Sequence, residues 1–144
     1  MAVLGIDLGS RRIGLAISDP EGRVALPAGT LESRGRAADL AAIGTLARER
    51  GVRRVVVGLP LHMNGRAGPE AQAARAFADA LARELGLPVE TLDERWTTRE
   101  AERTLRETGG SGRRKRRGVA DTLAATLLLR TFLERLGRGE AREP

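Results

Sequence analysis

Acidic residues occur at three separate places in this 144-residue sequence where a carboxylate could have a catalytic or metal-binding role. Asp7 lies inside the apolar run AVLGIDLG, the acidic pair Asp93-Glu94 follows an apolar segment, and Asp121 begins the apolar stretch near the end of the chain. A buried carboxylate is costly unless something compensates its charge. Carboxylates are the ligands that Mg²⁺ and Mn²⁺ prefer, and two such ions about 4 Å apart can hold the attacking and leaving oxygens of a phosphodiester. The three sites therefore indicate phosphodiester hydrolysis with Mg²⁺ or Mn²⁺, and we expect two ions.

Each carboxylate also has a simpler interpretation, which the residues alone leave open. Asp7 could cap a turn or pair with Arg11 or Arg12. Acids are common near helix N-termini, where the helix dipole favours them. That effect would account for the acidic pair before a predicted helix, and for Asp121 if it lies in the first turn of the last helix.

The strand around Asp7 adds one observation in favour of a site. Side chains alternate between the two faces of a strand, so Asp7 shares its face with Gly5 and Gly9. Glycines leave room for another group to approach the backbone closely. We expect such a group on this face of the sheet.

The predicted elements place the acids at strand ends and helix starts. Apolar periodicity and turn residues predict strands at 2–9, 13–19, 23–31, 52–60 and 87–93, and helices at 36–50, 69–85, 97–108 and 119–136. A meander followed by crossover helices predicts an α/β fold with one mixed five-stranded sheet, in which a three-stranded antiparallel meander precedes parallel strands and helices cover both faces. This order is typical of the ribonuclease H-like fold. We expect a single domain over residues 1–137 and a charged, frayed tail over 138–144.

The composition of the chain limits the kinds of binding partner that we expect. The net charge is +6, which favours a polyanion such as nucleic acid, although nearly all of the positive charge is arginine and part of it could reflect the composition of the source genome. The chain has no cysteine, and no apolar stretch is long enough for a transmembrane helix, so we expect a cytoplasmic protein without a membrane partner. The scarce aromatic residues argue against a stacking platform for bases.

Several other polar residues lie close to the acids. Arg95 could hold a phosphate or neutralise Glu94, and Trp96 is expected to be partly buried core more than a stacking partner for a base. The lone histidine, His62, is interpreted as a surface or substrate contact. A basic block precedes the last predicted helix, and we interpret it as a mobile clamp on phosphates, with a merely solvated charge run as the alternative. Its members are Arg113, Arg114, Lys115, Arg116 and Arg117.

Four motifs together resemble one known family. GIDLGSRRIGLAISD, VVVGLPLHMNG, LDERWTTREAE and VADTLAATLLL occur in order, and the resemblance to the YqgF/RuvX family extends from residue 2 to about residue 133. The family is described as Holliday junction resolvases or pre-16S rRNA nucleases with a ribonuclease H-like fold. The resemblance implies a metal-dependent nuclease whose catalytic and metal-binding acids are Asp7, Glu94 and Asp121, with Asp93 a less certain neighbour.

The resemblance leaves the substrate open. Maturation of the 5′ end of pre-16S rRNA is the favoured role, and resolution of branched DNA is the alternative. A resolvase needs two active sites and hence a homodimer, whereas a ribosomal RNA nuclease could be a monomer. Two other classes of function are alternatives. DLGSRRIG is similar to the phosphate loop of actin-like and sugar-kinase ATP-binding domains, which need a second domain, and the chain could also be a non-catalytic factor that binds nucleic acid.

Overall fold

The fold is a five-stranded mixed sheet between two layers of helices. The computed structural model describes residues 1–96 and 113–139. Its elements, in chain order, are β1 (Ala2–Leu8), β2 (Arg12–Ser18), β3 (Ala25–Glu32), α1 (Arg36–Glu49), β4 (Val52–Leu59), α2 (Pro69–Leu85), β5 (Val89–Asp93), the short 3₁₀ helix η1 (Glu94–Trp96) and α4 (Arg113–Gly137). The predicted fold class is confirmed, and the helix expected at 97–108 lies outside the described residues.

The sheet order is β3-β2-β1-β4-β5, with β1 in the middle. β1 and β2 pair antiparallel, as do β2 and β3, so the chain opens with the predicted meander. β4 lies parallel to both β1 and β5. The carboxyl ends of β1, β4 and β5 therefore meet at one edge of the sheet, and Asp7 and the acidic pair lie at that edge.

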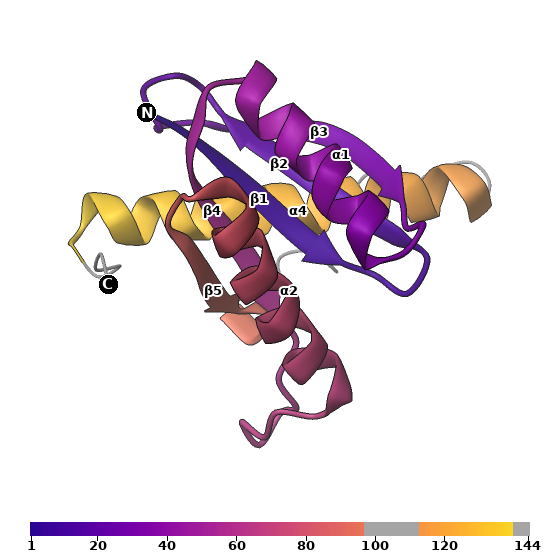
Figure 1. Ribbon diagram of the computed structural model, residues 1–144. Coiled ribbons are helices and arrows are strands. Elements are labelled where there is room, and N and C mark those ends of the chain that lie inside the picture. The colour runs from indigo at the N-terminus through magenta and orange to yellow at the C-terminus, as the bar shows by residue number, and fades with distance from the viewer. Residues whose placement is uncertain (97–112, 140–144) are drawn as a thin grey trace.

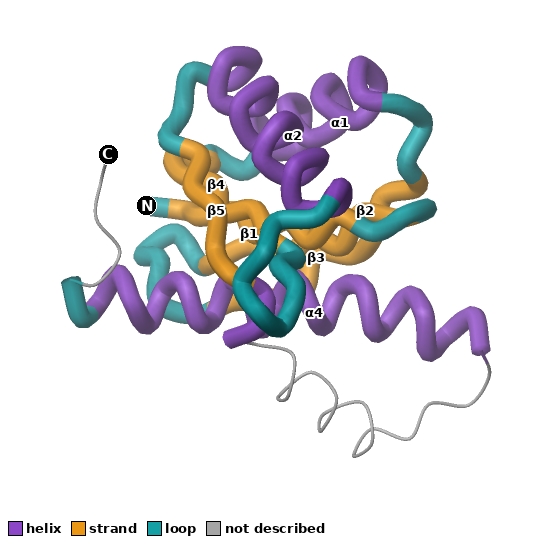
Figure 2. Tube along the Cα trace, turned by 90° about the horizontal axis from the view of Figure 1, so that it is seen from below, coloured by secondary structure: helices purple, strands orange, loops and turns teal. Residues whose placement is uncertain are grey.

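Helices cover both faces of the sheet, as Figures 1 and 2 show: α1 and α2 lie on one face and α4 crosses the other. The alternation of side chains explains the two cores. On the α1/α2 face, the strand residues Leu4, Ile6, Val55 and Val57 pack with Ile43, Phe77 and Leu81. On the α4 face, Val3, Val56 and Leu92 pack with Ala125, Leu129 and Phe132. Among the described helices, none is both long enough and apolar enough to cross a membrane.

The start of the last helix differs from the prediction. α4 begins at Arg113 and not at Val119, so the basic block forms its first turns instead of preceding it. Arginine and lysine are good helix formers, and Gly118 costs the helix only about 1 kcal/mol. Asp121 consequently lies in the third turn of α4, where complementing the helix dipole no longer explains it, because that effect is confined to the first turn.

Candidate active site

Asp7 and Glu94 meet at the carboxyl end of the parallel strands. Asp7 is the sixth residue of β1, and Glu94 begins η1 directly after β5. Both residues are half-buried, and their carboxyl groups share a hydrogen bond. Burial, then that hydrogen bond, and then the negative charges of Asp7 and Asp93 raise the pKa of Glu94 to about 9. At neutral pH, the carboxyl group of Glu94 is therefore in its protonated form.

Gly58 makes this meeting possible. Val57 of β4 pairs with Ile6 of β1, so Gly58, the next residue of β4, lies beside Asp7. A Cβ atom at Gly58 would lie 2.9 Å from both Cγ and Cδ of Glu94. The Glu94 side chain thus occupies the space that any larger residue at position 58 would need, and it crosses β4 through that space to reach Asp7.

A second glycine admits Asp121 from the other side. Gly14 of β2 pairs with Asp7, and a Cβ atom at Gly14 would lie 2.7 Å from the carbonyl carbon of Asp121. The hydroxyl of Thr122 donates a hydrogen bond to the carbonyl oxygen of Leu15 at 3.1 Å, which ties this turn of α4 to β2. The group that approaches the glycine-lined face of β1 is therefore α4.

The electrostatics link Asp121 to the same site. Burial and the charge of Asp7 raise the pKa of Asp121, and Arg12 opposes that shift. Arg12 Nη1 lies 3.9 Å from Asp121 Oδ2, so Arg12 pairs with Asp121. The simpler interpretation, in which Arg12 pairs with Asp7, is not supported. Asp7 is the common neighbour through which the three predicted carboxylates interact.

The chemistry of Asp7 and Glu94 fits a divalent cation. Their carboxyl groups are hydrogen-bonded to each other, and carboxylate oxygens are the ligands that hard cations prefer. Within residues 1–95 and 121–139, no three His, Cys, Asp or Glu side chains are arranged to hold an ion together, and Asp121 lies 3.9 Å from Arg12. The residue types fit a divalent cation, and two of the three carboxyl groups, those of Asp7 and Glu94, are in contact.

Asp93 and Arg95 form a separate unit beside the site. Arg95 donates hydrogen bonds from Nε and Nη2 to Asp93 Oδ2 at 2.8 and 2.6 Å, and these bonds lower the pKa of Asp93. Arg95 Nη1 also donates to the carbonyl oxygen of Met63 at 3.1 Å. The two members of the acidic pair therefore have different partners. Glu94 contacts Asp7, whereas Asp93 binds Arg95, which in turn donates a hydrogen bond to the loop 60–68. The idea that Arg95 neutralises Glu94 is not supported, because its carboxylate partner is Asp93.

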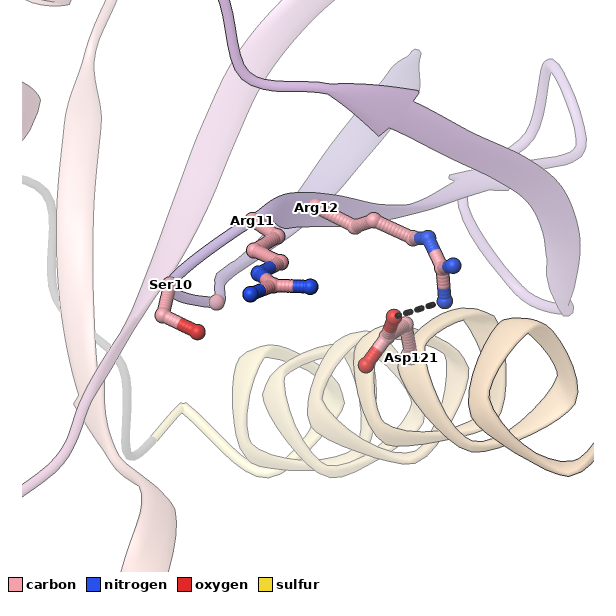
Figure 3. A pocket seen from close by; sticks show the side chains of 5 residues that line it. Ser10, Arg11, Arg12 and Asp121 are labelled. Carbon is pink, nitrogen blue, oxygen red and sulfur yellow. Dashed lines mark ion pairs between the residues drawn. The ribbon is translucent and has the colours of Figure 1, made fainter. Parts of the chain in front are cut away.

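A pocket of about 340 Å³ opens beside Asp121 (Figure 3). Its other lining residues come from the turn between β1 and β2 and from the first residue of β2: Gly9, Ser10, Arg11 and Arg12. From the sequence, these arginines are expected only as partners of Asp7. Gly14 and Gly58 are not among the predicted site residues, and the sequence signal for each is a glycine inside a predicted strand.

The remaining predicted residues are placed only in part. His62 is exposed in the loop 60–68, and its ring lies against Gly68. The backbone of Trp96 ends η1, and the basic block forms the first turns of α4, but the side chains of residues 96 and 113–120 lie outside the described residues.

Comparisons with known proteins show what the whole chain is similar to. The family model described as "RuvX: Holliday junction resolvase" matches residues 1–135. A protein of Moorella thermoacetica named "Putative pre-16S rRNA nuclease" is 51% identical over 138 residues, which are 96% of this chain and 98% of that protein. A protein of Anaeromyxobacter dehalogenans with the same name is 50% identical over 135 residues, covering 94% of this chain and 98% of the other. Among solved structures, RuvC of T. thermophilus in complex with a Holliday junction substrate has a TM-score of 0.67 and 16% identity, with both chains covered completely, which shows the shared fold.

Proposed function

This chain belongs to the RuvX family, and from that premise we propose that it is a divalent-metal-dependent nuclease that hydrolyses phosphodiester bonds of structured nucleic acid. We further propose that its role is the maturation of the 5′ end of pre-16S rRNA in the cytoplasm, because relatives that are about 50% identical carry that name. The observation that carries the proposal is the hydrogen-bonded pair Asp7–Glu94 at the carboxyl ends of parallel strands, with Asp121 placed beside it by α4.

We assign the catalytic and metal-binding roles to Asp7, Glu94 and Asp121, with Mg²⁺ or Mn²⁺ as the ion and two ions expected. A bound divalent ion would supply a water molecule of lowered pKa and would stabilise negative charge on the phosphate. Asp7 is the central ligand, because it is the neighbour of both other carboxylates. Glu94 would hold the ion in its deprotonated form, and Asp121 would hold it after turning from Arg12, which lies 3.9 Å away.

The positive charges have two proposed roles in binding the substrate. We assign residues 113–117 contacts with phosphates away from the cut. This assignment is supported by the position of the basic block on the first turns of α4, which extend past the sheet in Figures 1 and 2. Arg95 remains partly exposed while it is hydrogen-bonded to Asp93. We assign the exposed edge of its guanidinium group a contact with the bound nucleic-acid strand.

Resolution of branched DNA is the second candidate. It is favoured by the description of the family model and by the fold shared with RuvC. Cutting two symmetry-related strands needs two active sites, so this candidate requires a homodimer, whereas processing of one RNA end is compatible with a monomer.

The test is cleavage of two substrates by the purified protein. An end-labelled fragment of the pre-16S rRNA leader and a four-way DNA junction are each incubated with Mg²⁺, with Mn²⁺ or with EDTA. The variants are Asp7→Asn and the matched control Asp79→Asn, which removes an exposed carboxylate from α2 on the opposite face of the sheet.

Metal-dependent cleavage that is lost in Asp7→Asn and kept in Asp79→Asn is the expected result, and the RNA should be cut more efficiently than the junction. Preferential cutting of the junction by a dimer would replace the ribosomal role with the resolvase role. Binding without cleavage, unchanged by EDTA and by Asp7→Asn, would overturn the nuclease proposal in favour of a non-catalytic binding factor.

A further inference from the structure

The turn between β1 and β2 presents two arginines to the pocket beside Asp121. Arg11 is exposed, and the side chain of Arg12 is 30% exposed. Figure 3 shows both side chains extending from the turn toward α4. Within the described part of the chain, Arg11 has no recorded ion pair, and the Arg12–Asp121 separation of 3.9 Å is longer than a hydrogen bond. Both guanidinium groups therefore keep donors available for a ligand.

The backbone that carries these arginines is fixed. The amide of Gly9 donates to the carbonyl oxygen of Arg12 at 2.9 Å and closes the turn, and the carbonyl oxygen of Arg11 accepts from the amide of Ser33 at 2.9 Å. A Cβ atom at Gly9 would lie 2.5 Å from the Arg12 carbonyl oxygen, so the turn requires glycine there. The two side chains consequently start from a rigid platform, which reduces the entropy lost when they bind a ligand.

The lining of the pocket selects an anion. Two guanidinium groups and the Ser10 hydroxyl offer donors, and the single carboxylate, Asp121, already has Arg12 opposite it. Arginine is suited to phosphate because its planar fork donates two parallel hydrogen bonds. A phosphodiester group that entered here would lie next to Asp121, and Asp121 lies next to Asp7.

We propose that Arg11, Arg12 and Ser10 form a binding site for a backbone phosphate of the substrate, adjacent to the phosphate that is cut. This inference rests on the proposed nuclease function and adds the subsite that fixes the strand relative to the carboxylates. In this proposal Arg12 lies opposite Asp121 in the free protein and binds the phosphate in the complex, so that Asp121 would no longer face a guanidinium group.

The experiment measures the salt dependence of binding in EDTA, where no cleavage is expected. A fluorescent four-way junction and a fluorescent RNA hairpin are titrated from about 50 to 200 mM salt with the wild type, Arg11→Gln, Arg12→Gln and the double variant. Arg83→Gln is the matched control, because it removes an exposed arginine from α2 on the opposite face. The slope of log K against log salt should fall by about 0.9 for each duplex phosphate contact that is lost.

The double variant should lose one to two phosphate contacts by this measure and bind about tenfold more weakly at low salt, whereas Arg83→Gln should match the wild type. Equal slopes for the double variant and Arg83→Gln would overturn the proposal. Arg11→Gln, at an exposed side chain, carries the test alone if the double variant does not fold.

Two further measurements distinguish a backbone phosphate from a free phosphate, and the phosphate site from the proposed nuclease function. If inorganic phosphate or ATP at submillimolar concentration raises the Tm of the wild type but not that of the double variant, the pocket takes a free phosphate or a nucleotide, and the backbone assignment is wrong. If the wild type cuts neither substrate with Mn²⁺ while the slopes change as expected, the nuclease proposal fails and the phosphate site stands.

Discussion

Replacing Glu94 with glutamine should stabilise the metal-free protein at alkaline pH and abolish cleavage. Burial and the hydrogen bond with Asp7 raise the pKa of Glu94 from 4.5 to about 9. Because the pKa is raised by folding, the folded protein keeps a proton that the unfolded chain has lost. Stability is therefore full below about pH 4.5 and declines as the pH rises toward about 9. A glutamine keeps a donor for Asp7 and has no charge to bury.

The size of the effect follows from the pKa shift. Each pH unit above the unfolded pKa removes about 1.4 kcal/mol from the free energy of unfolding until the folded pKa is reached. At pH 8, about 3.5 units above that value, the upper bound is about 5 kcal/mol. Glu94 is only half-buried and its carboxyl group interacts with that of Asp7, so we expect somewhat less than half of this bound, roughly 2 kcal/mol.

The assay is urea denaturation in EDTA at pH 5 and pH 8. Glu94→Gln should be more stable than the wild type by roughly 2 kcal/mol at pH 8, and the difference should nearly vanish at pH 5. The control Glu84→Gln changes an exposed residue of α2 and should stay within about 0.5 kcal/mol of the wild type at both values. Equal urea midpoints for Glu94→Gln and the wild type at pH 8 would refute the reasoning, because they would mean that burying this carboxyl group has no energetic consequence.

Three other predictions concern the same edge of the sheet. Gly58→Ala should displace the Glu94 carboxyl group and lower the single-turnover rate about 100-fold, with a Tm within a few degrees of the wild type; an unchanged rate would show that the close approach is dispensable. Mn²⁺ should raise the Tm more at pH 8 than at pH 6, because ligation displaces the proton of Glu94, and the same rise at both values would contradict this. Arg95→Gln removes the bond to the Met63 carbonyl oxygen, so hydrogen exchange of amides in the loop 60–68 should become faster, and unaltered exchange would mean that other contacts hold the loop.

The sequence was sufficient for the elements that have a clear apolar period. The run Val55–Val57 is buried on both faces of the sheet, and such runs predict a parallel strand. The start of α4 was not predictable in the same way, because a glycine-rich stretch followed by five basic residues is typical of a loop. Arginine and lysine are compatible with a helix as well, and their charges carry no periodicity that would show it.

The site was predictable as a set of residue types but not as a set of contacts. Asp7 was recognisable because an ionised group inside an apolar strand needs compensation. Nothing in the order Asp93-Glu94 tells which carboxylate enters the site. That depends on the turn from β5 into η1. In this turn the Asp93 carboxylate accepts a hydrogen bond from the amide of Arg95, and the Glu94 side chain lies against Gly58. Sequence spacing also gives no sign that glycines on two strands flank Asp7, since the strands pair only in the folded sheet.

The flanking glycines explain why Asp7 is the common neighbour of Glu94 and Asp121. β1 is the central strand, so a side chain near its carboxyl end would ordinarily be shielded by neighbours on β2 and β4. At the level of Asp7 both neighbours lack a side chain: Gly14 admits the backbone of Asp121, and Gly58 admits the carboxyl group of Glu94. Asp7 thus has an acidic residue on either side, and burial together with the like charges raises the pKa values of Glu94 and Asp121. For Glu94, this shift destabilises the metal-free fold as the pH rises above about 4.5. A cation bound beside Asp7 would remove the same penalty, so in the proposed nuclease the affinity for metal and the instability without it would have one structural cause.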